Sequence, residues 1–251
     1  MRVLTMQENS TVDMVSNGKV FDDYKTSQEL KVPKYLEETY WWAYVHPKSV
    51  QIFERQWLVN LILWGNFARL RDAALNEIGK TITGNNLQVA CVYGDFSQQM
   101  ATRLEAKSEL HIIDIAPVQI ENANRKLKDH CNVFLHQQDS TCLNFADGQF
   151  DNIVVFFLLH EQPEAVRAKT VEEVMRVVKP GGKVVFVDYH RPHWANPFRY
   201  IMVPILSVLE PYALGVWKKE IIDWVPAGLR PKKINKETLF GGLYQKVVMT
   251  R

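Results

Sequence analysis

The chain has 251 residues, of which 47% are hydrophobic and 23% charged, and its 30 basic and 28 acidic side chains give a net charge of +2. This composition excludes a disordered or collagen-like chain, and the even charge balance argues against a surface that grips nucleic acid. We therefore expect a folded α/β-sized domain with a sizeable core and no nucleic-acid partner.

The aromatic residues are the unusual part of the composition. The seven tryptophans fall into two groups, before residue 65 and after residue 193: Trp41, Trp42, Trp57 and Trp64, then Trp194, Trp217 and Trp224. Large rings with a polar edge favour cores, apolar-ligand pockets and membrane interfaces. The two aromatic segments are therefore candidates for a core, a pocket for an apolar ligand or a membrane contact.

The N-terminal third divides into two parts. Residues 1–31 are polar and without pattern, which predicts a mobile leader. They contain no apolar signal core, and the three scattered cysteines indicate a reducing, cytoplasmic compartment. Residues 32–80 have helical periodicity, and the wide apolar surface of the run 50–79 predicts burial on more than one side. Gly79 is the expected end of this run.

Residues 80–190 change to short apolar runs separated by helical stretches. The runs are 87–93, 109–115, 132–139, 150–159 and 183–189. Strands that are apolar on both faces and alternate with helices predict a mostly parallel sheet covered on both sides. We expect one domain over 32–251, with N-terminal helices (32–80), a ligand-binding core (87–190), an insert (191–231) and a terminal hairpin (232–251).

The insert is aromatic and interrupted by prolines. Residues 194–217 predict a lid or interfacial helix pair broken at Pro204 and Pro211. The stretch 198–217 carries Arg199, Glu210 and both prolines, so it falls short of a membrane-spanning helix. Packing as a helical cap in water is the alternative. In the terminal segment, two strands are expected to join through Gly241 and Gly242.

Ligands of an open parallel sheet bind beyond the carboxyl ends of its strands. The first such turn reads Ala90-Cys91-Val92-Tyr93-Gly94-Asp95 and holds a single glycine, which disfavours a dinucleotide. Asp114 ends the second strand, where a carboxylate can accept both ribose hydroxyls, although a solvated turn aspartate is the alternative. Asp139 and Ser140 end the third strand and could receive an adenine amino group or serve as a turn cap.

Taken together, these features resemble the class I S-adenosylmethionine-dependent methyltransferases. The order is a glycine turn, an acid after the second and third strands, Phe150-Asp151 opening the fourth strand, and Lys179-Pro180-Gly181-Gly182 before the fifth. The resemblance implies a Rossmann-type sandwich with a mostly parallel seven-stranded sheet and a C-terminal antiparallel hairpin. It also implies a cofactor site, in which two expected glycines are replaced by Ala90 and Val92. The implied cofactor-binding residues are Ala90, Val92, Gly94, Asp114, Ile115, Asp139 and Ser140.

Four longer segments are similar to the rhodoquinone-biosynthesis family (RquA). They are VYGDF, PKYLEETYWWAYVHP, FFLLHEQPEAVR and VDYHRPHWANP, and the similarity runs from about residue 32 to the C-terminus. The resemblance implies conversion of ubiquinone to rhodoquinone, in which an amino group replaces a methoxy group. It further implies S-adenosylmethionine as amino donor and a supporting divalent metal, Mn²⁺.

Such a substitution needs a polarised carbonyl and groups that move protons. His160 and Glu161 follow the fourth strand, and Asp188 and His190 follow the fifth, so all four should reach one rim. We expect metal ligands among His160, Glu161, Asp188 and His190, because manganese prefers oxygen ligands with some imidazole. Tyr93 or Asp95 would handle the proton, and His160 would stand beside the substrate. The alternatives are a helix-terminal charge for Glu161 and a strand-end hydrogen bond for Asp188.

Two other functions compete with this interpretation. One is a true methyltransferase acting on a quinone or another isoprenoid lipid, and the other is a catalytically silent protein that binds quinone or a partner enzyme. Because the isoprenoid tail of ubiquinone stays in the bilayer, we also expect peripheral contact with the cytoplasmic face of the inner membrane. Trp194 and Trp217 are the expected anchors, with Arg191, Arg199, Lys218 and Lys219 facing the headgroups.

Overall fold

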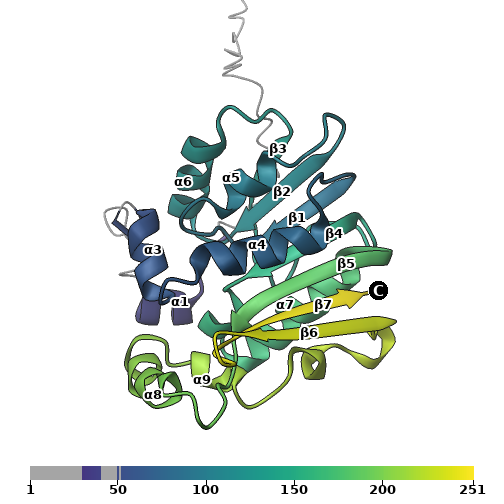
Figure 1. Cartoon of the computed structure of the whole chain (residues 1–251). Helices are drawn as coiled ribbons and strands as arrows, with labels where there is room; N and C mark the ends of the chain where they lie inside the picture. The colour runs from purple at the N-terminus through teal and green to yellow at the C-terminus, as the bar shows by residue number, and fades with distance from the viewer. Residues whose placement is uncertain (1–29, 41–49, 51) are drawn as a thin grey trace, which may run out of the picture.

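The computed structural model describes residues 30–40, 50 and 52–251. The predicted leader, apart from its last two residues, lies outside the described residues, as do Trp41 and Trp42. Figure 1 shows a central twisted sheet with helices on both faces. No helix in the described ranges is long and apolar enough to cross a membrane.

The sheet confirms the predicted fold class. Its seven strands run in the order β3-β2-β1-β4-β5-β7-β6. The first five are parallel, and β7 is antiparallel to both β5 and β6. The strands are β1 (Asn85–Val89), β2 (Glu109–Asp114), β3 (Val133–Gln137), β4 (Phe150–Phe156), β5 (Val178–Tyr189), β6 (Lys233–Leu239) and β7 (Tyr244–Thr250).

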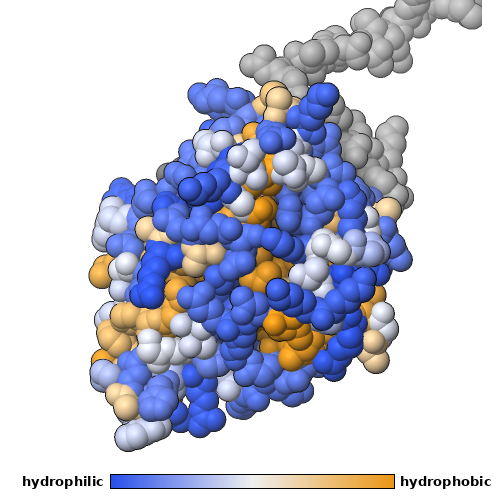
Figure 2. Space-filling view, turned by 45° about the vertical axis from the view of Figure 1, so that its right-hand side comes forward, coloured by the Kyte–Doolittle hydropathy of each residue, from blue (hydrophilic) through white to orange (hydrophobic). Residues whose placement is uncertain are grey.

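Two apolar layers cover the sheet because side chains alternate along buried strands. Val154 and Phe156 of β4 pack with α4 (Phe67–Ile78), α5 (Phe96–Ala101) and α6 (Pro117–Leu127). Ile153 and Val155 pack on the other face with α7 (Glu164–Val177) and the short helix η3 (Ile221–Trp224). The surface outside these layers is mixed, and Figure 2 shows one face on which hydrophobic patches lie among polar residues.

The N-terminal helices differ from the prediction. The described part contains α1 (Lys34–Tyr40), α3 (Gln56–Ile62) and α4, so the expected long run is divided. The division falls at Trp64 and Gly65, whose φ angles are 53° and 76°, and the Asn66 side chain donates to the Leu63 and Trp64 carbonyls. Gly79 ends α4 as expected. The predicted burial of this run on several sides is wrong for α3, because Trp57 and Leu61 are 62% and 65% exposed.

The insert forms α8 (Phe198–Leu209) and the short α9 (Ala213–Val216). The predicted break at Pro204 is wrong, because α8 continues through this proline. The helix ends instead at Glu210, just before Pro211. Trp217 packs partly buried against the core, whereas Trp194 is 68% exposed, so only one of the two expected anchors faces outward.

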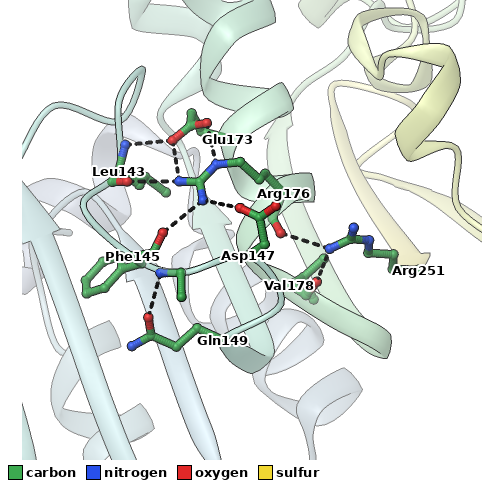
Figure 3. Close-up of polar contacts among 9 residues, drawn as sticks. Leu143, Phe145, Asp147, Gln149, Glu173, Arg176, Val178 and Arg251 are labelled. Atoms are coloured by element: carbon green, nitrogen blue, oxygen red, sulfur yellow. Dashed lines mark hydrogen bonds and ion pairs between the residues drawn. The ribbon is translucent and has the colours of Figure 1, made fainter.

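Arg176 ties the loop before β4 to α7, as Figure 3 shows. Its guanidinium donates to the carbonyls of Leu143 and Phe145 at 2.9 and 2.8 Å and bonds the carboxylates of Glu173 and Asp147. Arg251 in turn donates to the carbonyls of Arg176 and Val178. One side chain therefore holds the segment that connects β3 to β4.

Replacing Arg176 by Met is expected to destabilise the protein by about 2 kcal/mol, since two carbonyls and two carboxylates lose a charged partner that is partly screened by solvent. Thermal unfolding monitored by circular dichroism measures the loss. Arg69→Met, on the exposed side of α4, is the matched control and should leave the melting temperature unchanged. Equal melting of both variants would contradict a structural role for this cluster.

Candidate active site

Two adjoining pockets lie beyond the carboxyl ends of the parallel strands. The first, which we call the inner pocket, is lined by the ends of β1, β2 and β3 and by Pro33, Tyr35 and Leu36 of the α1 region. It brings together five of the predicted cofactor residues, namely Ala90, Asp114, Ile115, Asp139 and Ser140. The cover by α1 was not predicted, because nothing in residues 32–40 signals a ligand.

The backbone of the inner pocket is strained at two residues. Ala90 has φ 70° and Phe157 has φ 54°, both in the left-handed region that side chains with a Cβ rarely adopt. Ala90 was predicted to replace a glycine, and the turn indeed keeps the backbone conformation typical of glycine. Gln88 supports it by donating to the Ala90 carbonyl at 2.9 Å.

Asp114 lies at the centre of the inner pocket. Its carboxylate accepts the backbone N–H groups of Cys91 and Ala116 at 2.8 and 2.9 Å, which orients it across the turn. Burial raises the pKa of Asp114 to about 6, although these N–H donors favour the charged form. The carboxylate is therefore preformed as an acceptor for a pair of hydroxyl groups.

Asp139 and Ser140 line the inner pocket, and the side chain of each already makes hydrogen bonds within the protein. Oδ1 of Asp139 accepts the N–H and the hydroxyl of Thr141, both at 2.8 Å. The Ser140 hydroxyl bonds Thr170 at 2.8 Å and receives Gln162 Nε2 at 3.1 Å. Asp139 thus acts as the turn cap considered from the sequence, while its Oδ2 carries neither of these bonds.

Four residues of the first turn, Val92, Tyr93, Gly94 and Asp95, lie outside the inner pocket. Val92 lines the second pocket instead. Gly94 lines neither pocket; its carbonyl accepts Lys126 Nζ at 2.5 Å, and a Cβ there would meet the Phe67 ring. Asp95 is paired with Arg71 at 2.6 Å and lines neither pocket, and its catalytic role stays a prediction. After Tyr93 the turn runs toward α4, where Gly94 lies beside Phe67 and Asp95 pairs with Arg71.

The second pocket, which we call the apolar pocket, has a volume of about 550 Å³. Its walls come from α3, the ends of β4 and β5, and α8. Cys91, Phe157 and Glu161 line both pockets and form the border between them. The run 87–93 was predicted as one strand, but β1 ends at Val89 and leaves Cys91 at this border. Burial raises its pKa, so its thiol stays protonated.

Tyr93 is placed on the wall of the apolar pocket. Its hydroxyl receives a hydrogen bond from Gln119 Nε2 at 2.7 Å, and its ring stacks on Phe53 with centroids 6.0 Å apart. Burial raises the pKa of Tyr93 well above its usual value. The hydroxyl is therefore a proton donor and not the proton acceptor that a phenolate would be.

His160 and Asp188 form a buried pair at the apolar pocket. Nδ1 of His160 lies 3.0 Å from Asp188 Oδ1, and Nε2 lies 3.9 Å from Glu161. The Asp188 carboxylate also accepts backbone N–H groups of Leu159, His160 and Tyr189. Burial works against the charge on His160, but the Asp188 carboxylate and then Glu210 and Glu161 raise its pKa to about 9. The imidazolium is thus the expected form near neutral pH.

The four predicted metal ligands do not form a metal centre. Both oxygens of Asp188 are occupied by the bonds just described, and His190 Nδ1 and Nε2 bond the Gly242 carbonyl and Lys236 Nζ at 2.9 and 3.0 Å. The terminal hairpin therefore draws His190 away from His160. No group of three or more His, Cys, Asp or Glu side chains in the described ranges is arranged to hold a metal. The donor set does not fit manganese, which takes several oxygen ligands.

Glu210 is a site residue that sequence reasoning missed as such. It follows the last turn of α8 and lines the apolar pocket, where its buried Oε2 has no hydrogen-bond partner among the described residues. Burial raises its pKa, and nearby His160 and Tyr40 partly oppose this shift. Only its unusual place in an apolar helical segment could have drawn attention to it.

The sheet order and the helices around it give the α/β fold of the class I methyltransferases. Residues 87–182 match a family model described as a methyltransferase domain. Solved structures give the same fold: a SAM dependent methyltransferase from Aquifex aeolicus has a TM-score of 0.52 at 16% identity, covering 82% of this chain and 98% of that one. The N-methyltransferase NodS from Bradyrhizobium japonicum has a TM-score of 0.54 at 15% identity, covering 81% and 97%.

Curated relatives are quinone methyltransferases. A ubiquinone/menaquinone biosynthesis C-methyltransferase UbiE from Citrifermentans bemidjiense is 31% identical over 54% of this chain and 58% of its own length. A demethylmenaquinone methyltransferase from Staphylococcus saprophyticus is 27% identical over 54% and 57%. The chain thus spans little more than half the length of these relatives.

Proposed function

We propose that the protein is an S-adenosylmethionine-dependent enzyme that replaces a methoxy group of ubiquinone by an amino group, giving rhodoquinone. The observation that carries the proposal is the junction of the two pockets. The inner pocket, whose lining includes the carboxylates of Asp114 and Asp139, adjoins an apolar pocket large enough for a quinone ring and the first part of its tail. The quinone methyltransferases among the relatives support the substrate class.

The side chains around the border support a substitution that needs proton transfer. Glu161 borders both pockets, so its carboxylate can accept a proton from an amine held between them. The His160 imidazolium can donate a proton to the leaving methoxide. Burial raises the pKa of Glu210, and in its protonated form this carboxyl could donate a hydrogen bond to a quinone carbonyl, which would make the ring carbon more electrophilic.

The proposed reaction first exchanges the C–O bond of the ring for a C–N bond and then cleaves the N–Cα bond of the donor. The nitrogen lone pair forms the new C–N bond to the ring, the C–O bond breaks, and methoxide leaves as methanol after protonation. Release of the amino group then requires cleavage of the donor's N–Cα bond. A β-elimination, in which a proton leaves Cβ and the electron pair stays on nitrogen, balances this step without an oxidant. Because the predicted ligands do not fit manganese, no step is assigned to a metal.

The product tests this proposal directly. The purified full chain is incubated with a short-chain ubiquinone and S-adenosylmethionine carrying ¹⁵N in its amino group, with and without added manganese. Mass spectrometry should detect a quinone that has lost methoxy and gained a labelled amino group. An unlabelled aminoquinone would contradict S-adenosylmethionine as donor, and an unchanged quinone in both mixtures would contradict amination.

The competing function is C-methylation of a quinone, which the UbiE relatives favour. A demethylated quinol substrate and S-adenosylmethionine labelled in its methyl group distinguish the two, because only methylation transfers that label. Binding of S-adenosylmethionine without either product would indicate the catalytically silent protein. In each enzymatic case the tail of the substrate lies in a membrane, so we also propose a peripheral position at the cytoplasmic face of the inner membrane.

Binding of S-adenosylmethionine is expected to weaken below about pH 6. Asp114 must be ionised to accept the ribose hydroxyls, and its pKa is raised to about 6, so protonation removes the acceptor as the pH falls through that value. Affinity should fall up to about tenfold per pH unit below this point. Isothermal titration calorimetry between pH 5 and pH 8 measures it, and Asp114→Asn should show a weak, pH-independent affinity. A flat profile in the wild type would contradict this role.

A further inference from the structure

The exposed large hydrophobic side chains of the described residues are gathered in one region. All except Leu30 and Ile234 lie on α3, on α8 or next to these helices. We call this set the α3–α8 face. Its members are Ile52, Trp57, Leu61, Ile62, Trp64, Trp194, Tyr200, Ile201, Val203, Ile205, Val208 and Leu209.

The two helices form one continuous surface although they lie far apart in the sequence. Trp64 Nε1 lies 3.2 Å from the sulfur of Met202, and the rings of Trp64 and Phe198 have centroids 4.8 Å apart. Figure 1 places α3 and α8 on the same side of the molecule. A contiguous apolar patch of this kind on a soluble chain indicates a binding surface.

The apolar pocket opens into this face. Leu61, Ile62, Trp64, Ile205 and Leu209 are exposed and also line the pocket. A ligand in the pocket could therefore extend a hydrophobic tail directly across the face. A second copy of the chain seated here would close the mouth of the pocket, which disfavours a dimer as the occupant.

The charges around the face suit an anionic lipid surface. Arg55 and Arg191 are exposed beside it, and Arg199 is the only charged residue within α8. The acidic residues nearby are engaged elsewhere, since Glu54 pairs with Lys126 at 2.6 Å and Glu210 turns into the apolar pocket. Exposed Trp57, Trp194 and Tyr200 are the residue types that favour the headgroup region.

We propose that α3 and α8 together are the surface by which the protein lies on an anionic lipid bilayer, with the mouth of the apolar pocket opening into the hydrocarbon. The inference rests on the proposed function only for the identity of the substrate that enters. It replaces the sequence-based expectation, in which the insert alone, with Trp194 and Trp217, was the membrane contact.

Cosedimentation of the full chain with vesicles of equal parts phosphatidylethanolamine and phosphatidylglycerol tests the proposal. The variant Trp57→Ser/Val208→Ser changes two exposed residues that do not line the pocket, and Ile234→Ser is the control on β6. We expect the double variant to partition about tenfold or more weakly than wild type, the control to be unchanged, and phosphatidylcholine vesicles to bind more weakly. Equal partitioning of double variant and wild type would overturn the proposal, as would absence of binding by wild type.

Further measurements keep this test separate from the proposed function. Turnover of a short-chain quinone in solution should be the same for the double variant and wild type, whereas turnover of a long-chain quinone in vesicles should fall. Vesicle binding that depends on the α3–α8 face without conversion of any quinone would support the docking surface and contradict the enzymatic proposal. A wild-type dimer that the double variant dissociates, with no vesicle binding, would assign the face to a second copy and overturn the proposal.

Discussion

The Asp188→Asn variant is expected to lose about 10²–10⁴-fold in the rate of quinone conversion while its affinity for S-adenosylmethionine stays unchanged. Asp188 does not line either pocket but holds His160 through Nδ1 at 3.0 Å and accepts three backbone N–H groups. An amide presents an NH₂ group toward some of these donors and carries no charge. Asp188 is thus a positioning residue for His160.

The pH dependence separates this role from a purely structural one. The pKa of His160 is raised from 6.5 to about 9, so its contribution to stability is full below pH 6.5 and is lost as the pH rises through about 9. Activity that needs the imidazolium should decline over the same range. In Asp188→Asn the decline should move to lower pH by more than one unit. An Asp188→Asn rate that is lowered by the same factor at every pH would contradict the proposed effect of Asp188 on the His160 pKa. The His160→Gln variant should show no decline of activity as the pH rises through about 9.

Replacing Glu210 by Met is expected to make the protein more stable and less active. Burial raises the pKa of this carboxyl, so its ionised form is unfavourable in the folded protein above its ordinary pKa. Removing it should therefore raise stability by about 1 kcal/mol. The same change removes the proposed donor to the quinone carbonyl and should lower turnover by about 10²-fold.

Thermal unfolding and mass-spectrometric turnover of the same samples measure both effects. Glu210→Gln is the matched variant, because its amide keeps an N–H donor, and it should retain more activity than Glu210→Met. If both variants turn over quinone as fast as wild type, Glu210 does not contact the substrate. A fall in activity accompanied by a fall in melting temperature would indicate a structural role instead.

Much of the fold follows from local pattern. The strands 109–115 and 183–189 were predicted within a few residues of β2 and the end of β5, because buried parallel strands are nearly continuous apolar runs bounded by polar turns. The break at Trp64 and the unbroken course of α8 through Pro204 were missed. Both features depend on how adjacent helical turns pack on the rest of the protein, and the periodicity of apolar residues in the sequence carries no information about this packing.

The sequence predicted those residues of the candidate site whose position follows from the order and direction of the strands alone. Asp114, Asp139 and Ser140 meet in the inner pocket because parallel strands deliver their carboxyl ends to one edge. The same rule failed for His190, because the terminal hairpin supplies Gly242 and Lys236 as partners. The rule also does not record that Arg71, from a helix before the sheet, pairs with Asp95.

The sequence by itself determined the α/β class, the place of the inner pocket at the carboxyl ends of the strands and the presence of two aromatic segments, because each depends on local runs of residues. Tertiary structure alone decided that α3 and α8 form one face, that Glu210 turns into the apolar pocket, and that His160 pairs with Asp188 and not with His190. The physical reason is that these contacts join segments far apart in the chain. Their formation depends on how the whole core packs, which no local pattern encodes.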